Sequence, residues 1–249
     1  CFVTAFLAMT GTDKIAIVTG AARRVGRAIA DALLADGWRV VAHVHHVVDE
    51  VPDGAIKVFA DLGQADCAAR IFGAAPGPVA LLVNNAARFA ADSLAAPDAA
   101  QFAAHMAVNA AAPMLLIAEL ARRHSGGAAM AVNITDAKLA APNPDFLSYT
   151  LSKYALAGLT EVAARALAVR GIRVNAIAPA LMLPSGAQDE AGFAKMHALN
   201  PLNVGVDVAM VADALRFLIA QPAMTGQTLV VDGGQRFMAL PRDVQFLER

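Results

Sequence analysis

Residues 14–37, KIAIVTGAARRVGRAIADALLADG, carry the clearest indication of the fold. The first part of this segment, residues 14–19, clusters β-branched residues and is followed by a glycine, which predicts a buried strand. In its second part Val25, Ile29 and Leu33 recur every four residues ahead of Gly37, which predicts a helix with one apolar face. A strand, a glycine turn and a helix in this order predict one βα unit.

The same alternation continues along the chain. Apolar strands that alternate with helices predict right-handed βαβ crossovers and a parallel sheet covered on both faces. No repeat or linker interrupts the pattern, so we expect one doubly wound α/β domain over 9–249, and we expect the apolar residues 1–8 to be an extension outside it. We expect further strands at 39–44, 56–60, 80–85, 128–135, 172–178 and 228–233, and further helices at 64–73, 98–124, 148–169 and 206–220.

The composition limits the classes of function. Of the 249 residues 57% are hydrophobic, yet no window reaches the roughly 18 uninterrupted apolar residues of a membrane span. The formal net charge of -1 offers no basic surface to nucleic acid or anionic lipid. Cys1 and Cys67 make neither a disulfide framework nor a metal site, and His43, His45 and His46 do not share one strand face. We expect a cytoplasmic protein that acts on a small molecule without a metal.

The turn TGAARRVGRAIA, residues 19–30, suits a phosphate group. Gly20 and Gly26 would let backbone N–H groups approach a pyrophosphate at the start of the helix. The spacing departs from G-x-G-x-x-G, because Arg24 stands where the middle glycine usually lies. Ordinary turn glycines remain the alternative interpretation.

Other motifs follow in a set order. Asn84-Asn85-Ala86 ends a predicted strand, Tyr149 and Lys153 lie four residues apart on a predicted helix, and VDGG closes the pattern at 231–234. With the glycine turn they resemble the short-chain dehydrogenase/reductase superfamily over residues 13–237. The resemblance implies a single-domain Rossmann fold with a mostly seven-stranded parallel sheet, nicotinamide-dependent hydride transfer, and commonly a homotetramer that pairs through the helices at 98–124 and 148–169. The cofactor contacts that we expect are Gly20, Arg23, Arg24, Val25, Gly26, His45, His46, Asp61, Leu62, Asn85, Ala86, Tyr149, Lys153 and Pro179.

The end of the second predicted strand indicates which nicotinamide cofactor is used. An acidic residue there would bind the ribose 2′-hydroxyl of NAD, but this chain has His45 and His46, and no carboxylate before Asp49. Arg23 and Arg24 in the adjacent turn favour a 2′-phosphate, because a guanidinium pairs bidentately with phosphate oxygens. We therefore expect NADPH. The alternative interpretation is that the two histidines are solvated loop residues and the two arginines belong to a charged helix face. Asp61 could contact the adenine of the cofactor, and a local turn is the alternative for it.

A catalytic pair is predicted at Tyr149 and Lys153, which share one helix face. A nearby ammonium lowers the pKa of a phenol from about 10 toward working pH. Such a tyrosine can donate a proton to the atom left negative after hydride arrives. The resemblance places Asn109 in a water-linked relay to the lysine, with helix packing as the alternative. Where the superfamily has a serine upstream of the tyrosine, this chain has Asp136.

Asp136, Tyr149 and Lys153 combined with Arg24 narrow the resemblance to the pteridine reductase branch, which includes bacterial dihydromonapterin reductases. GAARRVGRAIADAL (20–33) is similar to that branch's phosphate loop, and Phe89 in NNAARF matches its pterin-stacking phenylalanine. Reduction of a pterin adds hydride to a ring C=N bond and a proton to nitrogen. Asp136 suits that proton transfer better than a serine if burial raises its pKa. The substrate contacts that we expect are Arg24, Phe89, Asp136, Tyr149 and Leu181.

The chain also departs from the branch. His46 replaces the usual arginine, which predicts weaker, pH-dependent binding of the 2′-phosphate. Ala87 and Arg88 replace small hydroxyl residues, and Ala180 replaces a glycine. Residues 184–204 are expected to be an irregular substrate lid, and the tail at 236–249 either reaches a neighbouring subunit's site or frays.

The sequence therefore favours an NADPH-dependent reductase of a pterin or dihydropterin. One alternative is a carbonyl reductase of the short-chain dehydrogenase type, in which Asp136 is merely tolerated. A second alternative is a catalytically silent NADPH-binding sensor, against which the intact Tyr149 and Lys153 argue.

Overall fold

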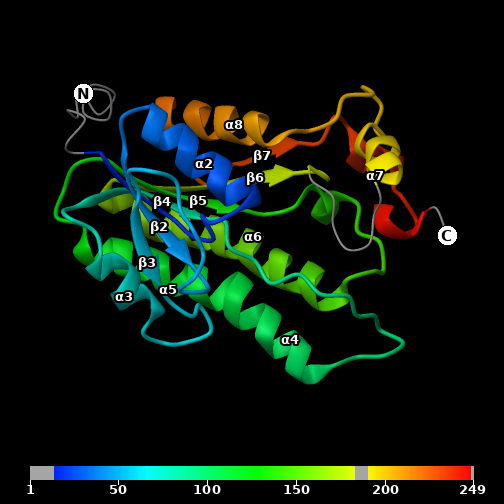
Figure 1. The fold of residues 1–249 in the computed structure, drawn as a ribbon, viewed down its shortest axis with the longest axis horizontal. Coiled ribbons are helices and arrows are strands. Elements are labelled where there is room, and N and C mark those ends of the chain that lie inside the picture. Colours follow the sequence, from blue (N-terminus) through cyan, green and yellow to red (C-terminus); the bar gives the residue numbers. More distant parts are fainter. Residues whose placement is uncertain (1–13, 183–189, 248–249) are drawn as a thin grey trace.

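The computed structural model describes residues 14–182 and 190–247, and its centre is a twisted parallel sheet (Figure 1). The sheet has seven strands in the order β3-β2-β1-β4-β5-β6-β7, and every pairing is parallel. The order reverses between β1 and β4, which is the switch point where such sheets bind ligands. The predicted α/β fold is confirmed. The strands are β1 (Ile15–Val18), β2 (Arg39–Val44), β3 (Ile56–Phe59), β4 (Val79–Asn84), β5 (Ala129–Ile134), β6 (Ile172–Pro179) and β7 (Thr228–Val231).

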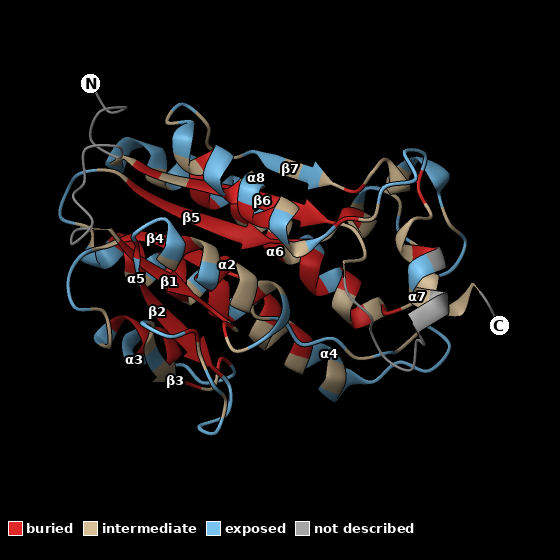
Figure 2. Cartoon of the chain, turned by 45° about the horizontal axis from the view of Figure 1, so that its top comes forward, coloured by how far each residue is buried: buried red, intermediate tan, exposed pale blue. Residues whose placement is uncertain are grey.

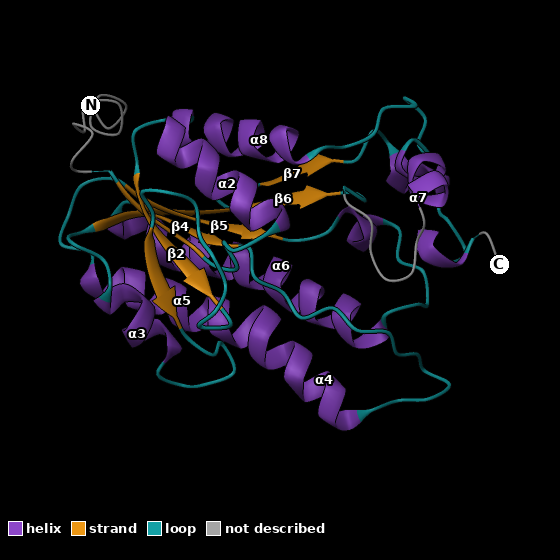
Figure 3. Ribbon diagram, viewed as in Figure 1, coloured by secondary structure: helices purple, strands orange, loops and turns teal. Residues whose placement is uncertain are grey.

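Helices cover both faces of the sheet (Figure 3). One face carries α2 (Arg24–Ala35) and α8 (Val208–Ala220), and the other carries α3 (Cys67–Gly73), α5 (Ala112–Arg123) and α6 (Leu147–Leu167). Alternate residues of β1 enter different cores: Ile17 packs with the α3 and α5 side chains, and Val18 packs with those of α2 and α8. This alternation follows from the two-residue period of a strand, and it explains why the central strands are apolar throughout.

Burial is concentrated in the middle of the sheet (Figure 2). Every residue of β1 and β5 is buried, whereas the edge strands β3 and β7 alternate between half-buried and exposed positions. Full burial of a leucine or isoleucine such as Leu82 or Ile17 stabilises a fold by about 1.5–3 kcal/mol. The packed centre therefore holds the carboxyl ends of β1, β4 and β5 in fixed positions.

The helix predicted at 98–124 is divided by one turn of π-helix. It comprises α4 (Ala99–Met106), a π segment at Ala107–Ala111, and α5. Pro113 lies four residues after Asn109 and has no N–H, so the Asn109 carbonyl cannot accept the regular α-helical bond. The stretch Ala99–Arg123 is long and apolar enough to cross a membrane by length and composition alone. Here it packs against α3 and α6 as part of a helix layer.

The segment after β6 differs from its prediction. The expected irregular lid at 184–204 contains α7 (Glu190–His197), whose sequence places no regular apolar face that would have predicted a helix. Residues 183–189 and the expected extension at 1–8 lie outside the described residues. The tail is ordered in short 3-10 turns at Gln235–Met238 and Val244–Phe246, and it lies with α7 beyond the carboxyl ends of β6 and β7 (Figure 1).

Candidate active site

A cavity of about 1110 Å³, lined by described residues, opens at the carboxyl ends of the strands. Of the residues predicted to bind cofactor or substrate, or to act in catalysis, it collects all but Asn109, which lies buried behind its wall. These residues come from loops that are far apart in the sequence, and the fold brings them together around one cavity. The predicted residues that line the cavity are Gly20, Arg23, Arg24, Val25, Gly26, His45, His46, Asp61, Leu62, Asn85, Ala86, Phe89, Asp136, Tyr149, Lys153, Pro179 and Leu181.

The turn after β1 is tight enough to require its glycines. Gly20 has a φ of +67°, and a Cβ on Gly26 would lie 2.1 Å from the Gly20 carbonyl oxygen. Thr19 Oγ1 accepts hydrogen bonds from the backbone N–H groups of Asn85 and Ala86, both at 3.0 Å. Asn85 Nδ2 donates in return to the Thr19 carbonyl oxygen (2.9 Å). These bonds join the ends of β1 and β4 beside the start of α2, where Gly20 and Gly26 carry no side chain, which fits the close approach of a pyrophosphate group.

Arg24 occupies a backbone conformation that normally requires glycine. Its φ is +54°, in the left-handed region, whereas the neighbouring Arg23 is extended with a φ of −152°. A left-handed non-glycine residue costs about 1–2 kcal/mol. The residue that replaces the usual middle glycine thus keeps a glycine-like backbone and adds a guanidinium to the cavity wall.

His43 is a site residue that the sequence did not single out. Its buried ring accepts a hydrogen bond from Gly20 N at Nδ1 (3.2 Å), and its Nε2 lies 3.0 Å from the Ala60 carbonyl oxygen. Since Nδ1 accepts, Nε2 carries the hydrogen and donates to Ala60. Burial lowers the pKa of His43 and so favours this neutral ring. A histidine on an otherwise apolar strand, two residues before the predicted His45, was the available signal.

Basic and acidic groups meet at the corner beyond β2. The exposed rings of His45 and His46 contact edge to face, with centroids 4.5 Å apart. Asp49 also lines this corner, and its Oδ2 accepts a hydrogen bond from His46 N (3.0 Å). No role was predicted for this carboxylate, yet the turn at 45–49 brings it back to the predicted phosphate corner.

Asp61 forms the local turn that was the alternative to a cofactor contact. Its Oδ1 accepts from Gly63 N (2.8 Å) and its Oδ2 accepts from Gln64 Nε2 (3.3 Å). These hydrogen bonds lower the pKa of the Asp61 carboxyl. Leu62 beside it is buried and lines the same end of the cavity.

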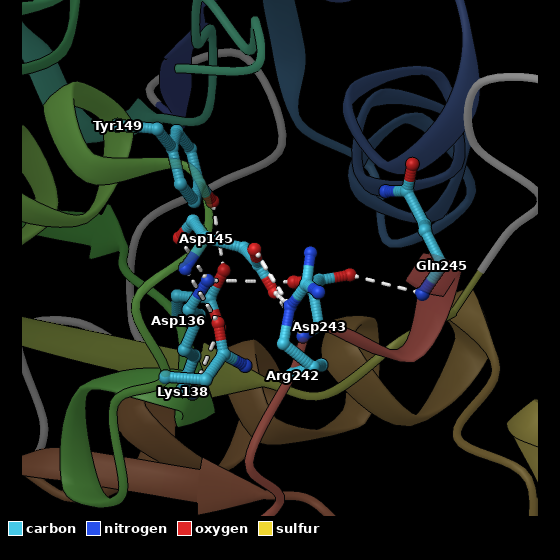
Figure 4. A network of polar contacts seen from close by, with 8 residues as sticks. Asp136, Lys138, Asp145, Tyr149, Arg242, Asp243 and Gln245 are labelled. Atoms are coloured by element: carbon cyan, nitrogen blue, oxygen red, sulfur yellow. Dashed lines mark hydrogen bonds and ion pairs between the residues drawn. The ribbon is translucent and has the colours of Figure 1, made fainter. Parts of the chain in front are cut away.

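Tyr149, Asp136 and Lys138 form one hydrogen-bonded set (Figure 4). The Tyr149 hydroxyl donates to Asp136 Oδ2 (2.8 Å), and Lys138 N donates to Asp136 Oδ1 (2.8 Å). Lys153 Nζ donates to the Ile134 carbonyl oxygen (2.6 Å) and lies 5.6 Å from the centre of the Tyr149 ring. Asp136 therefore takes the place beside the tyrosine that the superfamily gives to serine.

Burial dominates the protonation of this set. It raises the pKa of Asp136, which was the condition for its proposed role as a proton donor, and lowers the pKa of Lys153 to about 8 against the opposing effect of Asp136. The expectation that Lys153 lowers the pKa of Tyr149 is wrong in this geometry. Burial, followed by the Asp136 carboxyl, raises the pKa of Tyr149 well above its ordinary value, so the phenol keeps its proton.

Phe89 lies against Tyr149. Its ring meets the Tyr149 ring edge to face at 4.7 Å and stacks on Phe146 at 4.3 Å. Phe89 is 45% exposed, which leaves part of the ring open to the cavity. An exposed aromatic face at this place suits a flat ligand.

Asn109 supports the loop that carries Phe89. Its side chain accepts from Arg88 N (2.7 Å) and donates to the Arg88 carbonyl oxygen (3.0 Å) and to Ser152 Oγ (2.9 Å). The side chain is thus fully used in packing, which was the alternative to a relay role.

Known proteins resemble this chain over most of its length. The short chain dehydrogenase family model matches residues 14–192. Pteridine reductase 1 of Leishmania tarentolae is 30% identical over a comparison that covers 90% of this chain and 96% of that protein. The structure of FolM alternative dihydrofolate reductase 1 from Brucella canis complexed with NADP is 34% identical, with a TM-score of 0.81 over 90% of this chain and 94% of that chain. Diacetyl reductase of Staphylococcus aureus is 31% identical over 90% of this chain and 98% of its own length.

The matched segment contains the glycine turn, Tyr149 and Lys153, and the sheet order agrees with the fold that these motifs implied. The chain therefore belongs to the short chain dehydrogenase family of oxidoreductases.

Proposed function

We propose that the protein is an NADPH-dependent reductase of a pterin or dihydropterin. The observation that carries the proposal is the carboxyl group of Asp136, which contacts the hydroxyl of Tyr149 inside the cavity and has a raised pKa. A ring nitrogen that receives hydride at its neighbouring carbon becomes more basic and needs a proton. A carboxylic acid supplies that proton near neutral pH more readily than a serine hydroxyl does.

Different residues of the chain have separate roles in the proposed reaction. Bound NADPH supplies the hydride. Tyr149 and Asp136 hold the proton for the reduced ring, and the Lys153 ammonium stabilises the negative charge that is left behind on them. Phe89 presents an open aromatic face that stacks the flat ring and orients its C=N bond.

The choice of NADPH rests on the corner beyond β2. Arg23, Arg24, His45 and His46 line it, and Gly20 and Gly26 form the adjacent cradle for the pyrophosphate. Two guanidinium groups pair well with a dianionic 2′-phosphate. The solved FolM relative is itself a complex with NADP, which supports the same choice here.

A homotetramer is part of this proposal. Apolar side chains on the outer surfaces of α4, α5 and α6 are exposed, and an interface through these helices would bury them. A cytoplasmic location rests on the sequence alone. Size-exclusion chromatography with light scattering gives four chain masses if the tetramer forms. The exposed side chains on this surface are Phe102, Met114, Leu151, Tyr154 and Val162.

The decisive experiment is a spectrophotometric screen of the purified chain. Oxidation of NADPH is followed with dihydrobiopterin, dihydromonapterin, dihydrofolate and a panel of ketones, each repeated with NADH. We expect turnover of at least one pterin and much slower reaction with NADH. Brisk turnover of a ketone with none of any pterin would overturn the proposal in favour of a carbonyl reductase, the activity that the name of the diacetyl reductase relative gives.

A further inference from the structure

The C-terminal tail crosses the substrate end of the cavity. We call residues 241–246 the strap. Figure 4 shows Arg242 and Asp243 of the strap beside the group that contains Asp136 and Tyr149. The strap therefore lies against the chain's own catalytic groups, and Asp243 is itself part of the cavity wall.

Charged contacts join the strap to the loop at 137–146. Asp145 accepts from Arg242 Nε (2.8 Å) and from Asp243 N (2.7 Å). Lys138 Nζ donates to the Asp145 carbonyl oxygen (2.7 Å) and to Asp243 Oδ2 (3.4 Å). The side chains of Lys138 and Asp243 are only 11% and 14% exposed, so their contact is shielded from solvent.

Aromatic rings form a second connection between the strap and the loop at 137–146. Phe246 of the strap stacks on Phe146 at 5.7 Å, and Phe146 stacks on Phe89 at 4.3 Å. Phe146 is buried, precedes α6 directly, and has a left-handed φ of +55°. Such a conformation persists only where the surroundings fix it. The strap thus packs on the residue that sets the start of the helix carrying Tyr149.

The loop between these contacts joins the two proton-bearing residues. Asp136 precedes it and Tyr149 follows it within the first turn of α6. Lys138 is the link, because its backbone N–H bonds Asp136 Oδ1 while its ammonium bonds Asp243. A shift of the Lys138 side chain would move the backbone that orients the Asp136 carboxyl.

We propose that the strap positions the Asp136 carboxyl against Tyr149, with Asp243 as the positioning residue that acts through Lys138. Asp243 needs no contact with the reacting atoms in this role. Removal of one partner of a shielded ion pair leaves the other charge uncompensated, so the Lys138 ammonium turns toward water and the turn at 137–140 moves with it. The proposal rests on the proposed function only for its activity readout.

The test replaces Asp243 by its neutral isostere. Asp243→Asn should lower kcat for the dihydropterin roughly tenfold, with the KM for NADPH within about twofold, since misplacement of a catalytic group affects the transition state alone. Asp243→Glu should restore most of the rate. Lys138→Met should give the same loss, and the double variant should lose no more, because both changes break one interaction.

Asp36→Asn is the matched control. Asp36 pairs with Arg216 at 2.8 Å between α2 and α8 and does not line the cavity, so its loss should leave kcat unchanged. Hydrogen exchange of the peptide 137–146 adds a readout without substrate. It should be faster in Asp243→Asn and unchanged in Asp36→Asn.

If Asp243→Asn keeps the wild-type kcat and the wild-type rate of hydrogen exchange, the proposal that the strap positions Asp136 is overturned. An equal loss of kcat and NADPH affinity would also overturn it, because that pattern indicates general damage to the fold. If the wild-type protein reduces no pterin, the proposed function fails, and the exchange experiment still decides whether the strap holds the loop.

Discussion

The hydroxyl of Tyr149 donates its hydrogen bond to Asp136 Oδ2 over 2.8 Å, and the pKa values of both groups are raised by burial. Each group therefore keeps its proton to a higher pH than usual, and both groups lie beside the open face of Phe89. A serine in place of Asp136 would keep a hydrogen bond and lose the acid. This difference separates the two candidate activities.

Asp136→Ser should lower kcat for a dihydropterin by about 10²-fold, because general acid catalysis contributes 10²–10⁴-fold. Reduction of an activated ketone should hold or rise, since serine restores the usual hydroxyl beside the tyrosine. Both rates are measured on one preparation by NADPH absorbance. Equal losses on the two substrate classes would contradict the assignment of Asp136 as the proton source for nitrogen.

Arg24→Gly should stabilise the fold by about 1 kcal/mol, because a glycine relieves the left-handed backbone at φ +54°. The same change should raise the KM for NADPH, because it removes a guanidinium from the phosphate corner. Urea unfolding with an unchanged m-value measures the first effect. The control is Arg23→Gly, whose φ of −152° offers no strain to relieve. A gain in stability in both variants, or in neither, would refute the strain argument.

The order of strands and helices was predictable from local patterns. β2 at Arg39–Val44 matches its prediction residue for residue, because a run of only six residues that is rich in valine favours a strand over a helix. The candidate catalytic pair was predictable from spacing, since Tyr149 and Lys153 lie one helical turn apart. Contacts between segments far apart in the sequence were not predictable. The sequence holds no sign that Arg242 would pair with Asp145, 97 residues earlier.

Protonation states were also beyond the sequence. The spacing of Tyr149 and Lys153 indicates that an ammonium approaches a phenol, but the outcome depends on how deeply both are buried and on Asp136 between them. His43 was missed for a similar reason. Its two backbone partners, Gly20 and Ala60, belong to different loops that meet only in the folded sheet.

His43→Leu should weaken binding of NADPH about tenfold, which corresponds to 1.4 kcal/mol, because Gly20 N loses the bond that fixes the phosphate cradle. The kcat at saturating NADPH should change little. Quenching of protein or cofactor fluorescence measures the affinity. Thr160→Val is the control, because it removes buried hydrogen bonds to Asn133 and the Leu156 carbonyl away from the cavity. Equal weakening in both variants would indicate a general loss of stability.

Asp49→Asn should increase the preference for NADPH over NADH several-fold. The Asp49 carboxylate lines the corner where His45 and His46 lie, and its charge repels a 2′-phosphate. An asparagine oxygen keeps the bond from His46 N, so the turn should persist. The ratio of kcat/KM for the two cofactors is the measurement, with the neighbouring exposed Glu50→Gln as the control. A falling ratio in Asp49→Asn would mean that Asp49 does not oppose the phosphate.

The pH profile of turnover should show a basic limb near pH 8. The pKa of Lys153 is lowered to about 8 by burial, so its ammonium is present below that pH and is lost as the pH rises through it. Turnover falls with the ammonium, because an uncharged amine cannot stabilise the negative charge left after proton donation. Asp136 acts in the opposite direction and raises the pKa of Lys153, so Asp136→Asn should move the limb to lower pH in addition to slowing the reaction. The measurement is kcat with saturating NADPH and dihydropterin from pH 5 to 10, in wild type and variant. A limb that stays in place or moves to higher pH would show that Asp136 and Lys153 titrate independently.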